Sequence, residues 1–389
     1  MKTLVRLAAA LLFPIAANAG VLETEVTPEM AEMGCTARLS GVLETGDLDR
    51  IRPFLETPLT EGWGNPGSDN AMLFRNFTPA TDYGEGFFSH RLCLNSPGGS
   101  LAEAMRIVDY FREEASHTRG GVQTAIARGD RCEGSCAYVF FAGRFVRFSG
   151  NGYYEGRSNA LLHPNGRLGL HAPTLPINDE SSYSAEDVRA IWAVGMQAAS
   201  ELSRQIASGN IFLSGTLFSE ILTRPPGEML TIDTVAQAVQ WRIEVEPSPI
   251  HAGRYDYDFE VFAESLCRNA ALLTPDFVTL EPAAAGITLV QDAEENVRSQ
   301  GGFVDTRSGR EYSCGLEAFE WNNLQIDLQI MPEDWVMRRL RWNGSCGGAV
   351  TFEPVDPDSC YDCALDIDAP CLAVFPPETR LADLLNGAN

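Results

Sequence analysis

The sequence predicts an α/β protein with two domains. Its best-marked segment has an apolar run at 92–94, a Pro-Gly-Gly turn at 97–99 and apolar residues at helical spacing over 101–111, which is the pattern of a buried strand that breaks into a helix. A second segment repeats the pattern, with an apolar strand at 122–127 and a helix that begins near residue 135. A chain of 389 residues also fits two domains, at about 150 residues or more each.

The first 19 residues have the composition of a secretory signal peptide. Lys2 and Arg6 give a positive start, residues 7–16 form an apolar core, and an A-x-A cleavage site follows at 17–19. The core is shorter than the roughly 20 apolar residues that span a bilayer. We therefore expect a mature chain without a membrane span, located in the periplasm or secreted.

The charge of the chain disfavours two classes of partner. It has 29 basic and 53 acidic residues, a net charge of −24, and loss of Lys2 and Arg6 with the leader changes this to −26. So negative a chain should repel nucleic acid and anionic lipid. We expect a peptide or protein as substrate or ligand, and no cofactor.

We place a first domain at 20–246 and a second at 247–389, joined by a segment with prolines at 247 and 249. Near the start of the first domain, residues 35–43 alternate like a strand and a helix follows. Residues 60–88 are rich in Gly, Pro, Asn and Asp, and we expect this long loop to rim the site.

Residues 184–206 predict an amphipathic helix. Ser184 and the acidic residues after it resemble a helix cap. An apolar stripe follows at a period of 3.6, formed by Val188, Ile191, Trp192, Gly195, Ala198, Leu202 and Ile206. We expect this stripe to pack in the core.

The second domain is expected to be α+β or mainly β, and rich in cysteine. Short alternating apolar runs fall at 277–280, 287–290, 324–330 and 336–342. All ten cysteines follow the leader, four in the first domain and six in the second, and even numbers favour disulfides in an oxidising compartment. The spacing of Cys360 and Cys363 is too irregular to favour a zinc site, so no metal is expected.

Cys132 and Cys136 bracket the turn before the second predicted helix, and their role has several interpretations. They could form a local disulfide that fixes the turn, remain two separate thiols, or bind a metal. Cys136 could also be a nucleophile itself, although a thiol in an oxidising compartment tends to be oxidised.

The SPGG sequence at 96–99, the CEGSC sequence at 132–136 and His171 in RLGLHAP together resemble the Clp-protease/crotonase superfamily, and more closely its secreted Clp-protease-like branch. The resemblance covers about residues 36–244. It implies a Clp-protease/crotonase-like core, a ββα superhelix, and it places the strand of Cys35 beside that of Cys93, where a disulfide could join them. Because the cytosolic family often forms rings, a homo-oligomer is a further possibility.

By this resemblance Ser135 is the nucleophile, His171 is the base, and the backbone N–H groups of Gly99 and Cys136 hold the oxyanion. The register departs from the family at one place, because the family's serine position falls on Gly134 when it is counted back from the end of the following helix. Either the turn absorbs this shift and Ser135 acts, or the nucleophile is lost. Loss of the nucleophile costs a serine hydrolase about 10⁶ in kcat.

The third catalytic acid of the family is also displaced. Pro226 stands where the resemblance implies an aspartate, three residues before Met229. Glu220, Glu228 and Asp233 are nearby substitutes, and none is favoured over the others. Alternatively, Ser135 and His171 work as a dyad, with the imidazole tautomer held by a carbonyl or by a relocated carboxylate.

These residues lead to two hypotheses of different classes. The first is an exported serine hydrolase, in particular a peptidase, in which Ser135 attacks an acyl carbon and His171 takes and returns the proton. The second is a catalytically inactive Clp-like scaffold that binds a peptide or protein. The serine–lysine chemistry of signal-peptide peptidases is disfavoured because the mature chain has no lysine, and acyl-CoA chemistry because coenzyme A is cytosolic.

Overall fold

The structure is a computed structural model. It describes residues 20–57, 90–117, 121–148, 154–172, 183–225, 227–248, 259–273, 279–282, 288–291, 297–300, 302–320, 323–330, 335–343, 367–369 and 371–385. The predicted leader, the predicted loop at 60–88 and Pro226 lie outside these ranges. Within them, no helix has the length and apolarity needed to cross a bilayer.

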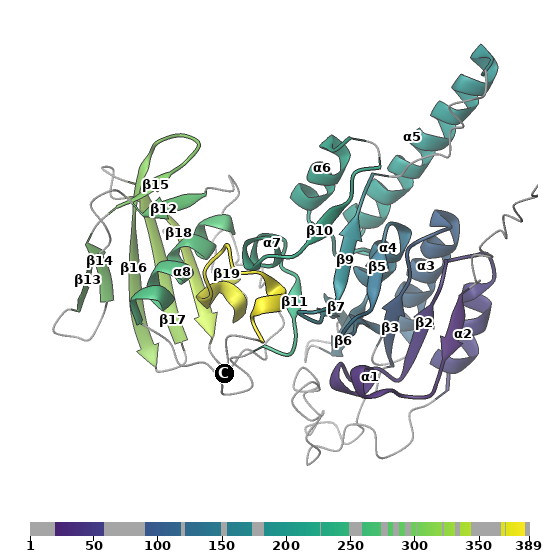
Figure 1. Cartoon of the computed structure of the whole chain (residues 1–389), viewed down its shortest axis with the longest axis horizontal. Helices are drawn as coiled ribbons and strands as arrows, with labels where there is room; N and C mark the ends of the chain where they lie inside the picture. The colour runs from purple at the N-terminus through teal and green to yellow at the C-terminus, as the bar shows by residue number, and fades with distance from the viewer. Residues whose placement is uncertain are drawn as a thin grey trace, which may run out of the picture.

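The first part of the chain builds a six-stranded sheet in the order β1-β2-β3-β4-β8-β11, so the α/β class expected from the sequence is confirmed (Figure 1). Five strands are mutually parallel and β1 lies antiparallel at one edge: β1 (Val21–Glu23), β2 (Ala37–Ser40), β3 (Arg91–Asn95), β4 (Gln123–Ile126), β8 (Ala160–Leu162) and β11 (Glu244–Val245). Every residue of β4 is buried, as is typical of a strand covered on both faces.

Helices cover both faces of this sheet. On one face, α1 (Pro28–Glu32) buries Met30 in a small cluster with residues of β3, β4 and β8. On the other face, α2 (Asp47–Leu55), α3 (Leu101–His117) and α4 (Ser135–Phe140) bury their apolar sides in the main core. The helices predicted after the two strand-to-helix turns are therefore present as α3 and α4.

A second, three-stranded sheet leads into the turn at Gly134 and into His171. Its strands are β5 (Arg131–Glu133), β9 (Arg167–Leu170) and β10 (Leu230–Ile232), in the order β10-β9-β5. β5 and β9 are parallel, and β10 is antiparallel to β9. A separate two-stranded ladder joins β6 (Arg144–Phe148) to β7 (Tyr154–Ser158).

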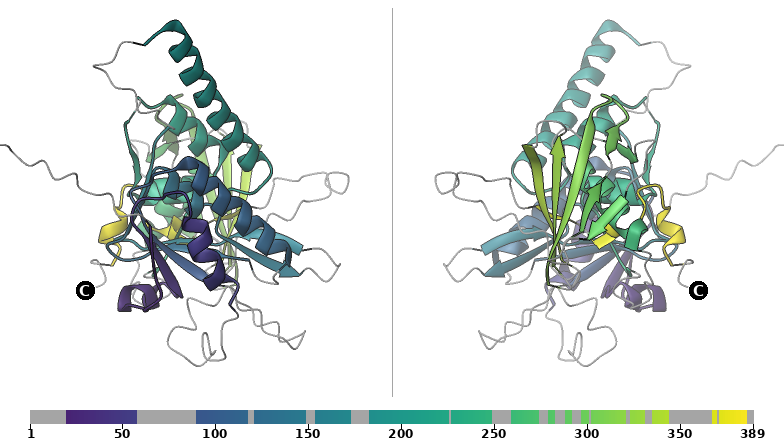
Figure 2. Two further views of the ribbon diagram at one scale, coloured as in Figure 1. Left: turned by 90° about the vertical axis from the view of Figure 1, so that its right-hand side faces the viewer. Right: turned by 90° about the vertical axis from the view of Figure 1, so that its left-hand side faces the viewer.

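The long helix α5 (Ala185–Ala207) begins as predicted and packs differently. Ser184 and Asp187 form a capping box at its start. Leu202 is buried, but Val188 and Trp192 on the same stripe are 55% and 71% exposed. The expectation that the whole stripe packs in the core is therefore wrong for the first half of the helix, which extends beyond the neighbouring elements in Figure 1 and Figure 2. Periodicity shows that a helix has an apolar face, and it does not show which element covers that face.

The last part of the chain is built on an eight-stranded sheet that α8 (Phe259–Leu272) contacts. Its strands are mainly antiparallel: β12 (Leu280–Pro282), β13 (Thr288–Gln291), β14 (Val297–Gln300), β15 (Phe303–Asp305), β16 (Glu311–Glu320), β17 (Asn323–Ile330), β18 (Trp335–Asn343) and β19 (Ile367–Ala369). The predicted runs at 324–330 and 336–342 lie in β17 and β18.

The C-terminal segment connects the two parts. It contains the short 3-10 helices η2 (Cys371–Val374) and η3 (Leu381–Asp383) and lies against α7 (Val235–Gln240), between the two large sheets of Figure 1. The N–H groups of Val235 and Ala236, at the start of α7, donate to carbonyl oxygens of this segment at 2.9 and 2.8 Å. The boundary at 246/247 stays a prediction.

Three disulfides are present among the described residues. They join Cys35 to Cys93, Cys132 to Cys136 and Cys267 to Cys314, with Cα–Cα distances of 5.5, 5.2 and 6.1 Å. The first is the bridge that the family resemblance implied. The second confirms the local-disulfide interpretation of Cys132 and Cys136, so neither is a free thiol that could attack a substrate or bind a metal.

The buried histidine His163 leads to a prediction about stability and pH. Its side chain is inaccessible to solvent, its Nδ1 accepts the N–H of Asn165 at 2.9 Å, and its Nε2 lies 3.5 Å from Glu32. Burial is the largest influence and lowers the pKa of His163, although the Glu32 carboxylate opposes it. The unfolded chain therefore binds a proton at a pH where folded His163 does not, and stability should fall as the pH drops through about 6.5.

Urea unfolding between about pH 7.5 and 5.5 measures this loss. His163→Asn keeps an acceptor for the Asn165 N–H and removes the titration, so we expect a smaller loss of stability over that range in the variant. Equal losses in the variant and the wild type would contradict the assignment.

Candidate functional site

The SPGG turn joins β3 to α3 and lies against β5. The N–H of Ser96 donates to the carbonyl of Arg131 at 2.6 Å, and the N–H of Glu133 donates to the carbonyl of Ser96 at 3.0 Å. Gly98 and Gly99 have φ values of 97° and 141°, which residues other than glycine rarely adopt. A Cβ on Gly98 would also lie only 2.7 Å from the carbonyl oxygen of Glu133. Gly98 is therefore needed for the turn to approach β5, and Gly99 for its close approach to Leu43.

Gly134 alone makes the turn from β5 to α4. Its φ of 56° and ψ of −123° are a backbone conformation that is costly for residues with a side chain. Its N–H donates to the carbonyl of Gly169 in β9 at 3.0 Å, and the Cys132–Cys136 disulfide spans it. A sharp turn of this kind between a strand and a helix is where several hydrolase folds hold their nucleophile.

The imidazole of His171 lies directly against this turn. The N–H of Gly134 donates to the carbonyl of Gly169 at 3.0 Å, and His171 comes directly after β9, so its ring reaches the turn at Gly134. A Cβ on Gly134 would be 2.8 Å from His171 Nε2. His171 therefore follows β9 and lies against the turn at Gly134.

The backbone sets the tautomer of His171. Its Nδ1 lies 2.7 Å from the carbonyl oxygen of Ala172. Because a carbonyl can only accept, Nδ1 carries the hydrogen, and Nε2 of the neutral ring has a free lone pair. This tautomer suits a general base. However, the residue in front of Nε2 is Gly134, which has no side-chain hydroxyl from which a base could take a proton.

The hydroxyl of Ser135 is buried and makes no hydrogen bond to His171. Ser135 is the first residue of α4, its side chain is 8% exposed, and its Oγ is buried without a hydrogen-bond partner among the described residues. One turn further along α4, Tyr138 is also buried, and desolvation raises its pKa to about 12. The Ser135 hydroxyl is thus inside the protein, and no hydrogen bond joins it to His171.

The structure bears on one of the two predicted oxyanion donors. A Cβ on Gly98 would lie 3.3 Å from the backbone nitrogen of Ser135, so the amide beside the SPGG turn is that of Ser135. The oxyanion roles assigned to Gly99 and Cys136 stay predictions.

The three substitutes considered for the third acid form ion pairs with arginines. Glu220 and Glu228 lie 3.1 and 2.7 Å from Arg224, and Asp233 lies 3.5 Å from Arg380. The described contact of His171 Nδ1 is the backbone carbonyl instead. The sequence left open whether a carbonyl or a relocated carboxylate holds the His171 tautomer. Among the described residues, the group at Nδ1 is a carbonyl.

Glu133 belongs to the site, although its sequence context did not reveal this. It precedes Gly134, is 7% exposed, and lies 2.8 Å from Arg167 and 3.8 Å from Arg131. Its Cγ would be 3.1 Å from a Cβ on Gly169, so it packs on the strand that leads to His171. The only signal in the sequence was an acidic residue inside an otherwise small and apolar turn.

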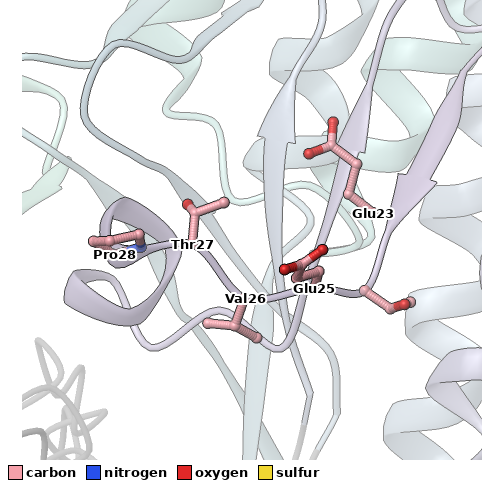
Figure 3. A pocket seen from close by; sticks show the side chains of 6 residues that line it. Glu23, Glu25, Val26, Thr27 and Pro28 are labelled. Atoms are coloured by element: carbon pink, nitrogen blue, oxygen red, sulfur yellow. The ribbon is translucent and has the colours of Figure 1, made fainter.

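A hollow of about 530 Å³ lies away from this turn, along the segment between β1 and α1 (Figure 3). It is lined by Glu23, Thr24, Glu25, Val26, Thr27 and Pro28. Burial would raise the pKa of Glu23, but hydrogen bonds from Arg38 and Ser40 outweigh it and lower that pKa. Among the described residues, no group of three or more His, Cys, Asp or Glu is arranged to hold a metal ion.

Comparison with known proteins adds no family to this geometry. No family model matches the chain, and no curated protein sequence matches it. The site is therefore interpreted from its own residues.

The contact between Gly134 and His171 leads to a prediction for a pair of glycine substitutions. Gly134→Ala should cost about 3 kcal/mol of stability, because the new methyl group meets both a strained backbone and the imidazole. Gly209 has a φ of 68° and open space around its Cβ position, so Gly209→Ala should cost only about 1 kcal/mol. Urea unfolding measures both, and the ring ¹⁵N signals of His171 should move in Gly134→Ala alone. Similar losses in the two variants would show that the imidazole does not press on this turn.

Proposed function

We propose that the chain is a catalytically inactive, Clp-protease-like scaffold that binds a peptide or protein at the turn formed by residues 96–99, Gly134 and His171. The observation that carries this proposal is that Nε2 of His171 faces a glycine, while the nearest hydroxyl in the sequence, that of Ser135, is buried. A base without a nucleophile leaves a serine hydrolase about 10⁶ slower in kcat.

The path of the chain supports the family part of the proposal. β4, β5 and α4 follow one another, as do β8, β9 and α5, and in each unit the first strand joins the large sheet and the second joins the small sheet. This repeated strand–strand–helix unit is what a ββα superhelix of the Clp-protease/crotonase kind would contain.

The polar groups that remain at the turn support a binding role. Gly98 of the SPGG turn approaches β5 closely, and the amide of Ser135 lies beside it. Backbone N–H groups in such a turn can donate to carbonyl or carboxylate oxygens of a peptide, and His171 adds an acceptor at Nε2. These are the groups that would hold a peptide carbonyl during hydrolysis, and they can hold it without cleaving it.

The disulfides support an exported location. Disulfides are typical of oxidising compartments, and this chain has three among its described residues. Together with the predicted leader at 1–19, they support a periplasmic or secreted location for the proposed binding function.

A fluorophosphonate probe distinguishes an inactive site from a hydrolase. The wild-type protein should not be labelled, because the hydroxyl of Ser135, the residue after Gly134, is buried. Gly134→Ser adds a hydroxyl beside His171 once the ring shifts to make room for the new Cβ, and should gain labelling, which Gly134→Ser combined with His171→Ala should lose. As a matched control, Ser135→Ala added to Gly134→Ser should keep the label. Labelling of the wild type that disappears in Ser135→Ala would overturn the proposal and restore the hydrolase.

Peptide binding tests the positive half of the proposal. A random peptide library displayed on phage should yield ligands for the wild type, and mass spectrometry should recover the corresponding synthetic peptides uncleaved after long incubation. His171→Ala should weaken their binding about tenfold, as expected for one lost hydrogen bond. Leu222→Ala, at an exposed position on α6 (Gly215–Thr223), should leave it unchanged. A library that yields no ligand, or ligands indifferent to His171, would refute the assigned site.

A further inference from the structure

The buried carboxylate of Asp47 has an oxygen that accepts no hydrogen bond. Asp47 is the first residue of α2, and its side chain is inaccessible to solvent. Its Oδ2 accepts the N–H of Glu44 at 2.8 Å, whereas its Oδ1 has no hydrogen-bond partner among the described residues. Buried polar atoms normally have such a partner, because removing a charge from water is costly without one. Oδ1 is therefore an acceptor site that calls for a donor.

Gly20 lies directly against this carboxylate. A Cβ on Gly20 would be 2.5 Å from Oδ1 and 2.7 Å from Oδ2 of Asp47, so a side chain at residue 20 would displace the carboxylate. From ordinary bond lengths, the backbone nitrogen of Gly20 lies within about 5 Å of Oδ1. The carbonyl of Gly20 accepts from the guanidinium of Arg50, whose Nη1 is 3.1 Å from the same oxygen. The residue before β1 is thus held beside Asp47.

The charges around Asp47 are not balanced. Burial, the largest influence, raises the pKa of Asp47, and the carboxylates of Glu103 and Glu44 raise it further. The guanidinium of Arg50 opposes this rise, and Arg106 lies 2.8 Å from Glu103. These groups are three carboxylates and two guanidiniums. One further cation at this place would balance them.

Cleavage of the predicted leader creates a cation on the nitrogen of Gly20. The A-x-A sequence at 17–19 places the cut between Ala19 and Gly20. Hydrolysis by a leader peptidase adds one water across this amide bond. Ala19 leaves with a carboxylate, and Gly20 keeps an amine that takes up the proton at neutral pH. The nitrogen is then no longer held in a peptide plane and can turn towards a partner.

We propose that the α-ammonium of Gly20, formed when the leader is removed, binds the carboxylate of Asp47 and fixes the start of the mature chain. The nitrogen has to move by only about 2 Å to reach hydrogen-bond distance of Oδ1. A charge-assisted bond at a buried carboxylate is stronger than a surface ion pair, because water does not screen it. The bond therefore forms only in the processed protein.

A short segment connects this contact to the SPGG turn. Asp47 holds the N–H of Glu44. The preceding residue, Leu43, donates its N–H to the carbonyl of Gly98 and accepts the N–H of Ser100, both at 2.8 Å. Leader removal should therefore slow the local opening of residues 43–47 and of the turn that they hold.

The α-amine can be probed by itself, because Lys2 is the only lysine in the sequence and leaves with the leader. In the exported chain an N-hydroxysuccinimide ester can then acylate only the amine of Gly20. At about pH 7.5 the folded wild type should react at least about tenfold more slowly than the urea-unfolded chain, because the bound ammonium is protonated and buried. Asp47→Asn, which keeps an acceptor for the Glu44 N–H, should react faster than the wild type. Asp49→Asn, exposed on the same helix, is the matched control and should react like the wild type.

A chain that begins one residue earlier, at Ala19, tests the contact without changing any side chain of the mature protein. The extension moves the amine about 3.5 Å along the chain, away from Asp47. Its unfolding temperature should fall by roughly 5 °C. Hydrogen exchange followed by mass spectrometry should be faster at residues 43–47 and 98–100. Adding the same extension to Asp47→Asn should have little further effect, because the partner is already lost.

Three results would overturn the proposal. The first is an exported chain whose intact mass shows a start other than Gly20. The second is equal acylation of the folded wild type and Asp47→Asn. The third is an extension to Ala19 that changes neither the unfolding temperature nor the exchange of residues 43–47. None of these measurements depends on peptide binding at His171, so the proposed function can fail while this contact stands.

Discussion

The site depends on the contact between the imidazole of His171 and the backbone of Gly134. Two features fix it, namely the parallel register that pairs Glu133 with Gly169 and the hydrogen bond from His171 Nδ1 to the carbonyl of Ala172. The ring can lie this close because the turn has no side chain, since a Cβ there would be 2.8 Å from Nε2. The imidazole is thus fixed in position and tautomer, and the volume that a side chain at residue 134 would fill is taken by the ring itself.

The surrounding structure holds this turn rigidly. The Cys132–Cys136 disulfide spans Gly134, and Ser96 bonds to the backbone of β5 on both sides. A rigid set of backbone donors binds a ligand with little loss of conformational entropy. Rigidity is useful to an enzyme and to a binding protein alike, so it does not distinguish them. The distinction comes from the missing hydroxyl.

Much of this arrangement could be predicted from the sequence. Turns rich in glycine after apolar runs gave β3 with α3 and the helix α4, and the family resemblance led to the Cys35–Cys93 disulfide and to His171 opposite the turn. The stripe on α5 was identified correctly but assigned to the core, although Trp192 is 71% exposed. The apolar periodicity of α5 predicts which face of the helix is apolar. It does not predict what packs against that face.

The sequence by itself determined where the strands, helices and glycine turns fall, because local backbone preference and apolar periodicity act over a few residues. The tertiary structure alone decided which of Gly134 and Ser135 meets the imidazole. Successive residues at the start of a helix point about 100° apart, so a shift of one position turns a hydroxyl from the site into the interior. That choice depends on how β5, β9 and the SPGG turn pack together, and these segments are distant in sequence.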